Sequence, residues 1–212
     1  MMDRISIDKA RELLEKYIKD DYTLKHSRES EVIMRALARR FNEDAKKKLQ
    51  NNSSCIPKDG AVFCNEELWA AAGLLHDLDW QETENNTSRH GSMTIEILQK
   101  EGYDIPELFH AIKAHCESLG CLGVKRESKL DYALSAAESI TGIIVAYVLM
   151  RPDKKLALAE ANSITKKFKD RSFAAKIDRG LINDIEKIGL NRTEFIEIAL
   201  NAMKEIADEI GF

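Results

Sequence analysis

The spacing of the apolar residues constrains the fold of this chain more than any other feature. In almost every segment they recur at every third or fourth position, and no run of five or more residues strictly alternates with polar ones. This period places apolar side chains along one face of an α-helix. The 44% apolar content is enough for a sizeable core, and the 32% charged content suits solvated helix faces. The sequence therefore predicts an all-α fold.

The chain is predicted to form one domain over residues 1–212. Only 3 Pro and 10 Gly interrupt it, and it contains no internal repeat. We expect a core over about residues 22–150, a helical extension over 151–212, and an exposed insertion in the polar, turn-rich stretch 45–63. Helices are expected from a cap at Ser6, over about 26–41, 65–76 and 128–150, from near 88 and 106, and from a capping-box spacing at Asn191.

Charge and hydropathy limit the partners of the chain. No apolar export segment follows the N-terminus, and the longest apolar run, residues 140–150, is too short to cross a bilayer, which predicts a cytoplasmic protein without a membrane partner. A formal charge of −4 argues against binding a nucleic acid polymer. The apolar side chains of the last helix suit either the core or a homodimer interface. The four cysteines match no zinc motif and are expected to be reduced thiols.

Helical spacing predicts whether each histidine side chain points toward the core or toward solvent. Four share a helix face with apolar or small residues and are expected to point inward: His26, His76, His90 and His115. His110 shares its face with charged residues, and about 140° of helical rotation separates it from His115, so we expect it at the surface. A single inward histidine is commonly a hydrogen-bonded core residue, and that reading stays open at each position.

Carboxylates accompany these histidines. Glu138 has Leu134, Thr141 and Gly142 on its own helix face, and a carboxylate that faces a core needs a cation, a metal or a proton. Asp77 directly follows His76. Together, the four inward histidines and the two carboxylates form a nitrogen and oxygen ligand set, which suits Fe, Mn, Zn, Ni or Co and also allows Mg.

The order of these residues resembles that of the HD-domain metal-dependent phosphohydrolases, and in particular the small HD-domain hydrolases. The resemblance spans about residues 22–210. It rests on His26, on Gly73-Leu74-Leu75-His76-Asp77, on Arg89-His90-Gly91, on Lys113-Ala114-His115 and on Ala136-Ala137-Glu138-Ser139. It implies a helical bundle with a metal site between its core helices.

By this resemblance, His26, His76, Asp77 and Glu138 hold one divalent metal ion, and His90 and His115 complete a second site that Asp77 bridges. The family usually has Asp at the last position, where this chain has Glu138. Asp131 could be recruited instead, but it lies near a helix start, where N-terminal capping explains it. We therefore expect Glu138 to be the ligand.

The implied activity is hydrolysis of a phosphoester or phosphoanhydride bond in a small phosphorylated molecule, with a nucleotide favoured, by metal-activated water. Asp79 is the candidate to orient that water or to move protons; alternatively, it is an ordinary loop carboxylate. Lys113 is the candidate to bind phosphate; alternatively, it is an ordinary surface lysine. Two alternatives remain: a di-iron oxygenase with the same ligands, and a non-catalytic module in which the metal only joins helices.

Overall fold

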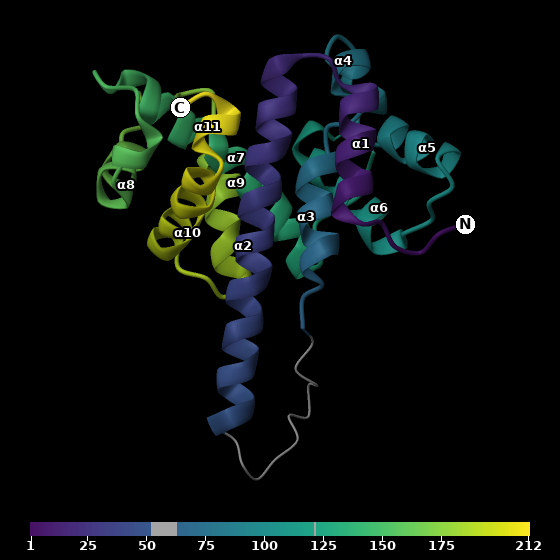
Figure 1. Cartoon of the computed structure of the whole chain (residues 1–212), viewed down its shortest axis with the longest axis horizontal. Coiled ribbons are helices and arrows are strands. Elements are labelled where there is room, and N and C mark those ends of the chain that lie inside the picture. The colour runs from purple at the N-terminus through teal and green to yellow at the C-terminus, as the bar shows by residue number, and fades with distance from the viewer. Residues whose placement is uncertain (52–62, 121) are drawn as a thin grey trace.

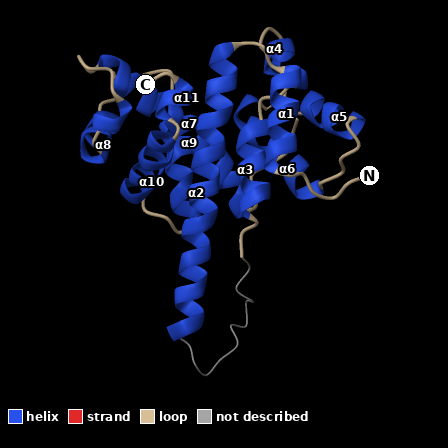
Figure 2. Ribbon diagram, viewed as in Figure 1, coloured by secondary structure: helices blue, strands red, loops and turns tan. Residues whose placement is uncertain are grey.

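The computed structural model describes residues 1–51, 63–120 and 122–212 of the chain. Within these residues the regular secondary structure is helical (Figure 2). One isolated bridge joins Met2 to Tyr103. The all-α prediction is confirmed.

Eight helices of nine or more residues and several shorter ones make up the described chain. In chain order they are α1 (Ile7–Tyr17), α2 (Asp21–Asn51), α3 (Glu66–Leu75), α4 (Trp80–Thr83), η1 (Thr87–Arg89), α5 (Ser92–Lys100), α6 (Pro106–His115), η2 (Cys116–Leu119), α7 (Lys129–Met150), η3 (Leu156–Leu158), α8 (Ala161–Lys169), α9 (Arg179–Asn183), η4 (Asp184–Ile188), α10 (Arg192–Glu205) and α11 (Ala207–Ile210).

Helix α2 runs through the middle of the molecule, with α10 and α11 on one side of it and α3 and α1 on the other (Figure 1). Its most extensive contacts are with α3, and it also packs against α7 and α10. At the α2–α3 contact the backbones approach closely, because a Cβ added to Gly73 would lie only 2.5 Å from the carbonyl oxygen of Ser30. Glycine at this position therefore sets the spacing of the two helices.

The predicted insertion over residues 45–63 is wrong in its first part. Helix α2 continues to Asn51, and its end projects beyond the neighbouring helices (Figure 1). Residues 45–50 are Ala, Lys, Leu and Gln, which all have high helix propensity, so the helix extends although the segment is polar. The rest of the predicted insertion, residues 52–62, lies outside the described residues.

Most predicted helix starts are confirmed by caps. The side chains of Ser6, Asn65 and Ser128 accept hydrogen bonds from the backbone of α1, α3 and α7, and Ser128 forms a complete capping box with Asp131. Asn191 also caps α10, but it bonds the amide of Thr193. The expected capping-box partner at that end, Glu194, instead forms an ion pair with Arg40.

The helix expected near residue 88 is wrong by about one turn. A short 3₁₀ helix covers Thr87–Arg89, and α5 begins only at Ser92, after Gly91 in a left-handed conformation with φ +78°. His90 therefore lies in the link between two helices. It is buried as predicted, but it does not lie on the face of a helix.

The long apolar helix α7 belongs to the core, as predicted. It is long and apolar enough to cross a membrane by length and composition, but most of its apolar segment is buried inside the protein. Ile140, Ile143, Ile144 and Val148 have no exposed surface. Burial against α2, α6, α9 and η4 explains its apolar composition.

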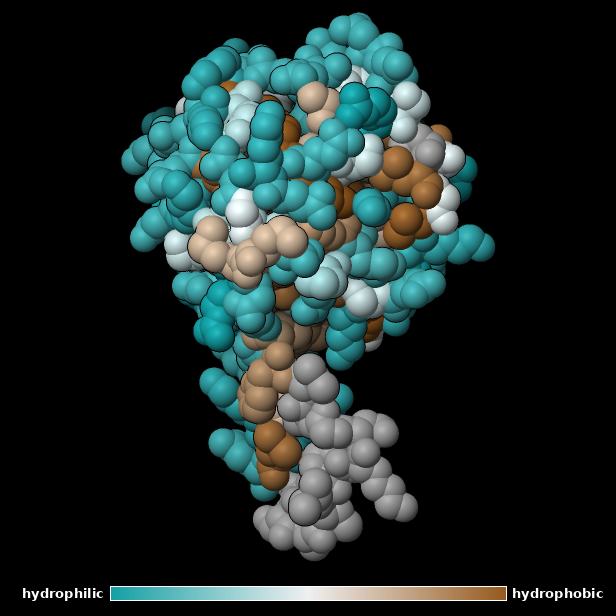
Figure 3. All heavy atoms as spheres, turned by 90° about the vertical axis from the view of Figure 1, so that its right-hand side faces the viewer, coloured by the Kyte–Doolittle hydropathy of each residue, from teal (hydrophilic) through white to brown (hydrophobic). Residues whose placement is uncertain are grey.

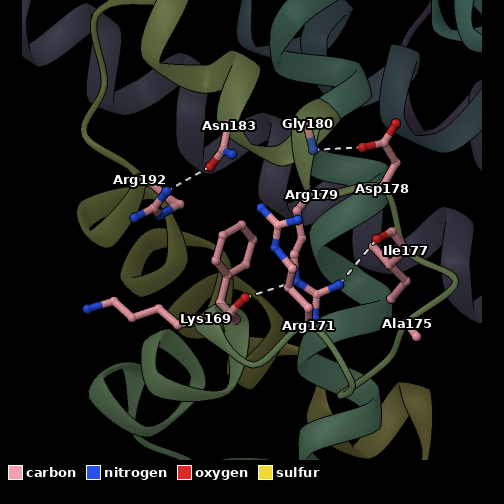
Figure 4. A pocket seen from close by; sticks show the side chains of 10 residues that line it. Lys169, Arg171, Ala175, Ile177, Asp178, Arg179, Gly180, Asn183 and Arg192 are labelled. Atoms are coloured by element: carbon pink, nitrogen blue, oxygen red, sulfur yellow. Dashed lines mark hydrogen bonds between the residues drawn. The ribbon is translucent and has the colours of Figure 1, made fainter.

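The C-terminal extension is held together by an arginine. The Arg179 guanidinium donates hydrogen bonds to five backbone carbonyls between residues 168 and 177, among them that of Phe168 at 2.9 Å, and it packs on the Phe168 ring. Arg192 packs on the same ring and donates to Asn183. These groups line a hollow of about 720 Å³, and Figure 4 shows how their side chains lie. Both guanidinium groups are thus engaged in structural contacts.

The face that carries α1, α5 and α6 is largely hydrophilic, with small separate hydrophobic areas (Figure 3). Scattered apolar residues of this kind are normal for a protein surface.

Candidate metal centre

The structure brings together all six residues of the predicted ligand set. His26 lies on α2, His115 ends α6, and Glu138 lies in the middle of α7. His76 and Asp77 follow the last residue of α3, and His90 lies in the link before α5. The ligand set depends on five separate segments, so the helical packing itself assembles the cluster.

Asp77 lies at the centre of the four imidazole rings. Its Oδ2 atom is 3.4 Å from Nε2 of His76 and 3.9 Å from Nε2 of His26. Its Oδ1 atom is 3.3 Å from Nε2 of His90 and 3.5 Å from Nε2 of His115. Each carboxylate oxygen therefore faces one pair of histidines, which is the arrangement that a bridging carboxylate requires.

The two histidine pairs have the spacing of ligands that share a cation. The Nε2 atoms of His26 and His76 are 3.3 Å apart, and those of His90 and His115 are 3.1 Å apart. Two nitrogen ligands at about 2.1 Å from one ion lie roughly 3.0 Å apart in octahedral and roughly 3.4 Å apart in tetrahedral coordination. The donor set thus fits divalent cations in both halves of the cluster.

The remaining ring nitrogens fix the orientation of the imidazoles. The Nδ1 atom of His76 lies 2.9 Å from the carbonyl oxygen of Gly73, and that of His115 faces the carbonyl oxygen of Ile112. A carbonyl oxygen can only accept a hydrogen bond, so in both rings Nδ1 carries the proton and Nε2 presents its lone pair to the cluster.

His26 and His90 are oriented in the same way by side chains. Nδ1 of His26 lies 3.1 Å from the Thr141 hydroxyl, which itself donates to the carbonyl oxygen of Glu138, so the hydroxyl is free to accept from the ring. Nδ1 of His90 donates to Oδ1 of Asp79 at 2.8 Å. All four Nε2 atoms are therefore available to bind a cation without any change of tautomer.

Asp79, predicted to act on water or protons, lies behind His90. Its side chain is buried, and Oδ2 accepts hydrogen bonds from the backbone N–H groups of Gly91 at 2.8 Å and Thr94 at 3.0 Å. Both oxygens are thus engaged, one by the ring and the other by the start of α5. This geometry supports a role for Asp79 in positioning His90, because the buried carboxylate already accepts from the ring and from the start of α5.

Glu138 completes the half of the cluster that contains His26 and His76. Ligand atoms of these three residues all lie within 4.8 Å of one another. Asp131, the alternative weighed from the sequence, lies elsewhere: its side chain caps α7 and contacts Nδ1 of His110 at 3.1 Å. Glu138 therefore lies with His26 and His76, and Asp131 does not.

The electrostatics of the cluster favour an added cation. Burial, together with the neighbouring His26 and His115, lowers the pKa of His76 to about 3, although Asp77 opposes the shift. Burial would raise the pKa of Asp77, but the surrounding histidines hold it well below its usual range. Burial likewise raises the pKa of Glu138. Buried carboxylates among imidazoles need positive charge from protons or from metal ions.

Without a metal ion, that charge comes from His90 and His115. Burial opposes their protonation, but hydrogen bonds with Asp77 outweigh it and raise the pKa of both rings. A cation that binds Nε2 replaces those protons.

Sequence reasoning missed Cys116, which was read only as a reduced thiol. Its buried sulfur lies 3.6 Å from both ring nitrogens of His115 and 3.5 Å from the carbonyl oxygen of His90. The sulfur and ligand atoms of His90 and His115 all lie within 4.8 Å of one another, so Cys116 is a further candidate ligand in this half of the cluster. The adjacency to His115 was the one signal in the sequence, and adjacency alone does not place two helical side chains together.

The predicted phosphate-binding cation is not part of the cluster. Lys113 lies two positions before His115 on α6, a rotation of about 200° that directs the two side chains to opposite sides of the helix. No described residue forms an ion pair with Lys113. The cations nearest in sequence to His26 are also engaged, since Arg28 pairs with Glu31 and Glu209 and Lys25 pairs with Asp21.

A comparison with protein-family models identifies the family of the chain. The model of the HD domain matches residues 23–145, more than half of the chain, and this span contains all six residues of the cluster. The chain therefore belongs to the HD-domain family, within a superfamily of metal-dependent hydrolases, as the resemblance predicted. The comparisons with curated proteins and with solved structures find no match.

Proposed function

We propose that this HD-domain protein hydrolyses a phosphoester or phosphoanhydride bond in a small molecule, and that the molecule is a nucleotide. The observation that carries the proposal is the orientation of the four imidazoles: each Nδ1 faces an acceptor, and each Nε2 faces Asp77. Such an arrangement prepares nitrogen ligands for cations on both sides of one carboxylate.

The residues of the cluster would form two cation sites that share Asp77. His26, His76 and Glu138 would hold one ion, His90 and His115 the other, and Asp77 would contact both. Divalent cations in these positions supply Lewis acidity toward a phosphoryl oxygen and a water molecule whose pKa is lowered toward neutrality. Thr141 and Asp79 keep the rings of His26 and His90 in the ligand tautomer.

The ligand chemistry supports a transition metal. Four of the six donors are imidazole nitrogens, which suit Fe, Mn, Zn, Ni or Co, whereas Mg takes oxygen ligands and keeps several waters. We therefore expect Mn, Fe or Co to support more activity than Mg. The formal charge of −4 argues only against a nucleic acid polymer as substrate. A cytoplasmic location stays a prediction.

The test combines metal content with a substrate panel. Purified protein is analysed for bound metals, and the same preparation is assayed with nucleotides, dinucleotides and phosphomonoesters in Mn, Co, Ni and Mg. We expect His76→Ala and Asp77→Ala to stay folded and to lose metal and activity together. His110→Gln is the matched control, because His110 is the one histidine outside the cluster, and it should keep both.

Two results would overturn the proposal. An iron-specific, redox-active cluster without phosphatase activity on any nucleotide would identify an oxygenase. A tightly bound metal with no turnover, together with unfolding of His76→Ala, would show that the metal serves the fold alone.

A further inference from the structure

A cavity of about 540 Å³ opens beside the metal cluster. It lies between the first turns of α2, the second half of α7 and the C-terminal residues of the chain. His26 and Thr141 belong to its wall as well as to the cluster. A molecule in this cavity would therefore be next to the histidine that holds one of the ions. The volume is in the range of sites for small organic ligands.

Most of the wall is apolar. Val145, Ala146, Leu149, Ile177 and Ile210 line it. Gly142 lines it too, and a Cβ added there would lie 2.7 Å from Cδ1 of Ile177. The cavity thus offers contacts to an organic group of low polarity, and the lysine in its lining, Lys25, is already paired with Asp21 at 2.8 Å.

Aromatic side chains stand at the mouth. Tyr22 is largely exposed, and its ring is parallel to that of His26, with an interplanar angle of 4° and centroids 6.3 Å apart. Phe212, near the end of the chain, also lines the cavity. Flat faces of this kind stack on the rings of nucleobases, and such stacking tolerates any base.

One polar group inside the cavity has no partner. Glu29 lines it, only 5% of the residue is exposed, and within the described residues its carboxyl group accepts no hydrogen bond and forms no ion pair. Burial raises the pKa of this carboxyl to about 7, although the charge of Lys25 opposes the shift. The carboxyl oxygens keep exposed surface inside the cavity, so a ligand that enters it can supply the hydrogen-bond donors that the protein does not.

We propose that this cavity binds the nucleoside part of the substrate, with Glu29 accepting hydrogen bonds from N–H groups on the edge of the base. The inference rests on the proposed phosphohydrolase activity, and it adds which part of the substrate decides specificity. A carboxylate has two acceptor oxygens and no donor, so it favours a base with adjacent N–H donors, as on the edge of guanine. It disfavours an edge that presents acceptors.

The first experiment measures selectivity. For wild type and Glu29→Gln, kcat/KM is determined for a guanine nucleotide and for inorganic pyrophosphate, which has no base. Glutamine keeps the size of the side chain but loses the charge and one acceptor. We expect the ratio of the two kcat/KM values to fall about ten- to hundredfold, mainly through the KM of the nucleotide. Glu43→Gln, the same change on an exposed position of α2, should leave the ratio unchanged.

The second experiment separates this inference from the proposed activity. Guanosine and uridine, which lack phosphate, are titrated into the full chain by calorimetry. We expect guanosine to bind more tightly than uridine, Glu29→Gln to remove that preference, and Ala146→Leu, which narrows the cavity, to weaken both. These results would stand even if no phosphate compound were hydrolysed.

Several outcomes would overturn the inference. An unchanged selectivity ratio in Glu29→Gln would do so. A loss of activity on pyrophosphate as large as that on the nucleotide would show that Glu29 acts through the metal cluster. Equal affinity of wild type and Glu29→Gln for guanosine would show that the base binds elsewhere.

Discussion

Replacing Asp79 by Asn tests the orientation of the imidazoles most directly. The carboxylate of Asp79 accepts from three donors: the His90 ring through Oδ1, and the amides of Gly91 and Thr94 through Oδ2. An asparagine has one acceptor oxygen. If that oxygen stays with the two backbone amides, the side-chain NH₂ group faces Nδ1 of His90 and forces this nitrogen to be an acceptor.

The consequence reaches the metal. When Nδ1 becomes an acceptor, the proton of neutral His90 moves to Nε2, and the lone pair that faces Asp77 and His115 is lost. A hydrogen bond to a charged group contributes about 1.5 to 3 kcal/mol, which corresponds to roughly a 10- to 150-fold change in affinity. Losses of about 10- to 100-fold are typical when a partner behind a histidine ligand is removed. We expect a loss in this range for the ion on the side of His90 and His115.

Calorimetric titration of the metal-free protein with Mn²⁺ or Co²⁺ measures both ions. The binding event that depends on His90 should weaken in Asp79→Asn, and the event that depends on His26 and His76 should change less. Asp104→Asn, on an exposed position, is the matched control. A purely structural role, fixing the start of α5, would lower the melting temperature of the metal-free protein and leave the affinity of the folded protein intact. Unchanged affinity and stoichiometry in folded Asp79→Asn would refute the reasoning.

Three further predictions follow from close packing, ligand length and burial. Gly73→Ala should destabilise the protein by about 1 to 3 kcal/mol in urea unfolding, because its Cβ would meet the backbone of Ser30. Gly142→Ala should lower the free energy of unfolding by less, because its Cβ would meet only the end of the flexible Ile177 side chain. Equal losses of stability in the two variants would contradict this reasoning. Glu138→Asp should retract the carboxylate by about one bond and weaken the ion held with His26 and His76, as measured by the same titration. Burial raises the folded-state pKa of Glu29 to about 7, so ionising this carboxyl costs free energy in the folded protein. The cost is absent below the unfolded-state pKa of about 4.5 and complete above about pH 7. In urea unfolding, Glu29→Gln should therefore be more stable than wild type by up to about 3 kcal/mol at pH 8 and equal to it at pH 4. A stability difference that does not change with pH would show that this carboxyl does not titrate as its burial implies.

The sequence predicted those parts of the site that follow from local periodicity. Helical spacing predicted that His26 and His115 point inward. The position of Asp131 at a helix start predicted that it caps the helix, which left Glu138 as the candidate ligand. It was less informative where the chain leaves regular structure: His90 is buried because a turn at Gly91 places it, which a helical face could not show. Nor could spacing show that Asp79 bonds the next helix start, or that Cys116 lies beside His115, because both depend on how separate segments pack.

Lys113 shows that closeness in sequence does not identify the positive charge that a phosphate would meet at the site. Its closeness to His115 in sequence suggested a phosphate ligand, but helical rotation separates the two side chains, and Arg28 and Lys25 are engaged by carboxylates. The positive charge that meets a phosphate at this cluster must therefore come largely from the ions that the histidines hold. One or two divalent cations would bring the formal charge from −4 to about −2 or 0, with the added charge confined to the site. Affinity for an anionic substrate would then depend on metal loading, and the net charge of the chain carries no information about it.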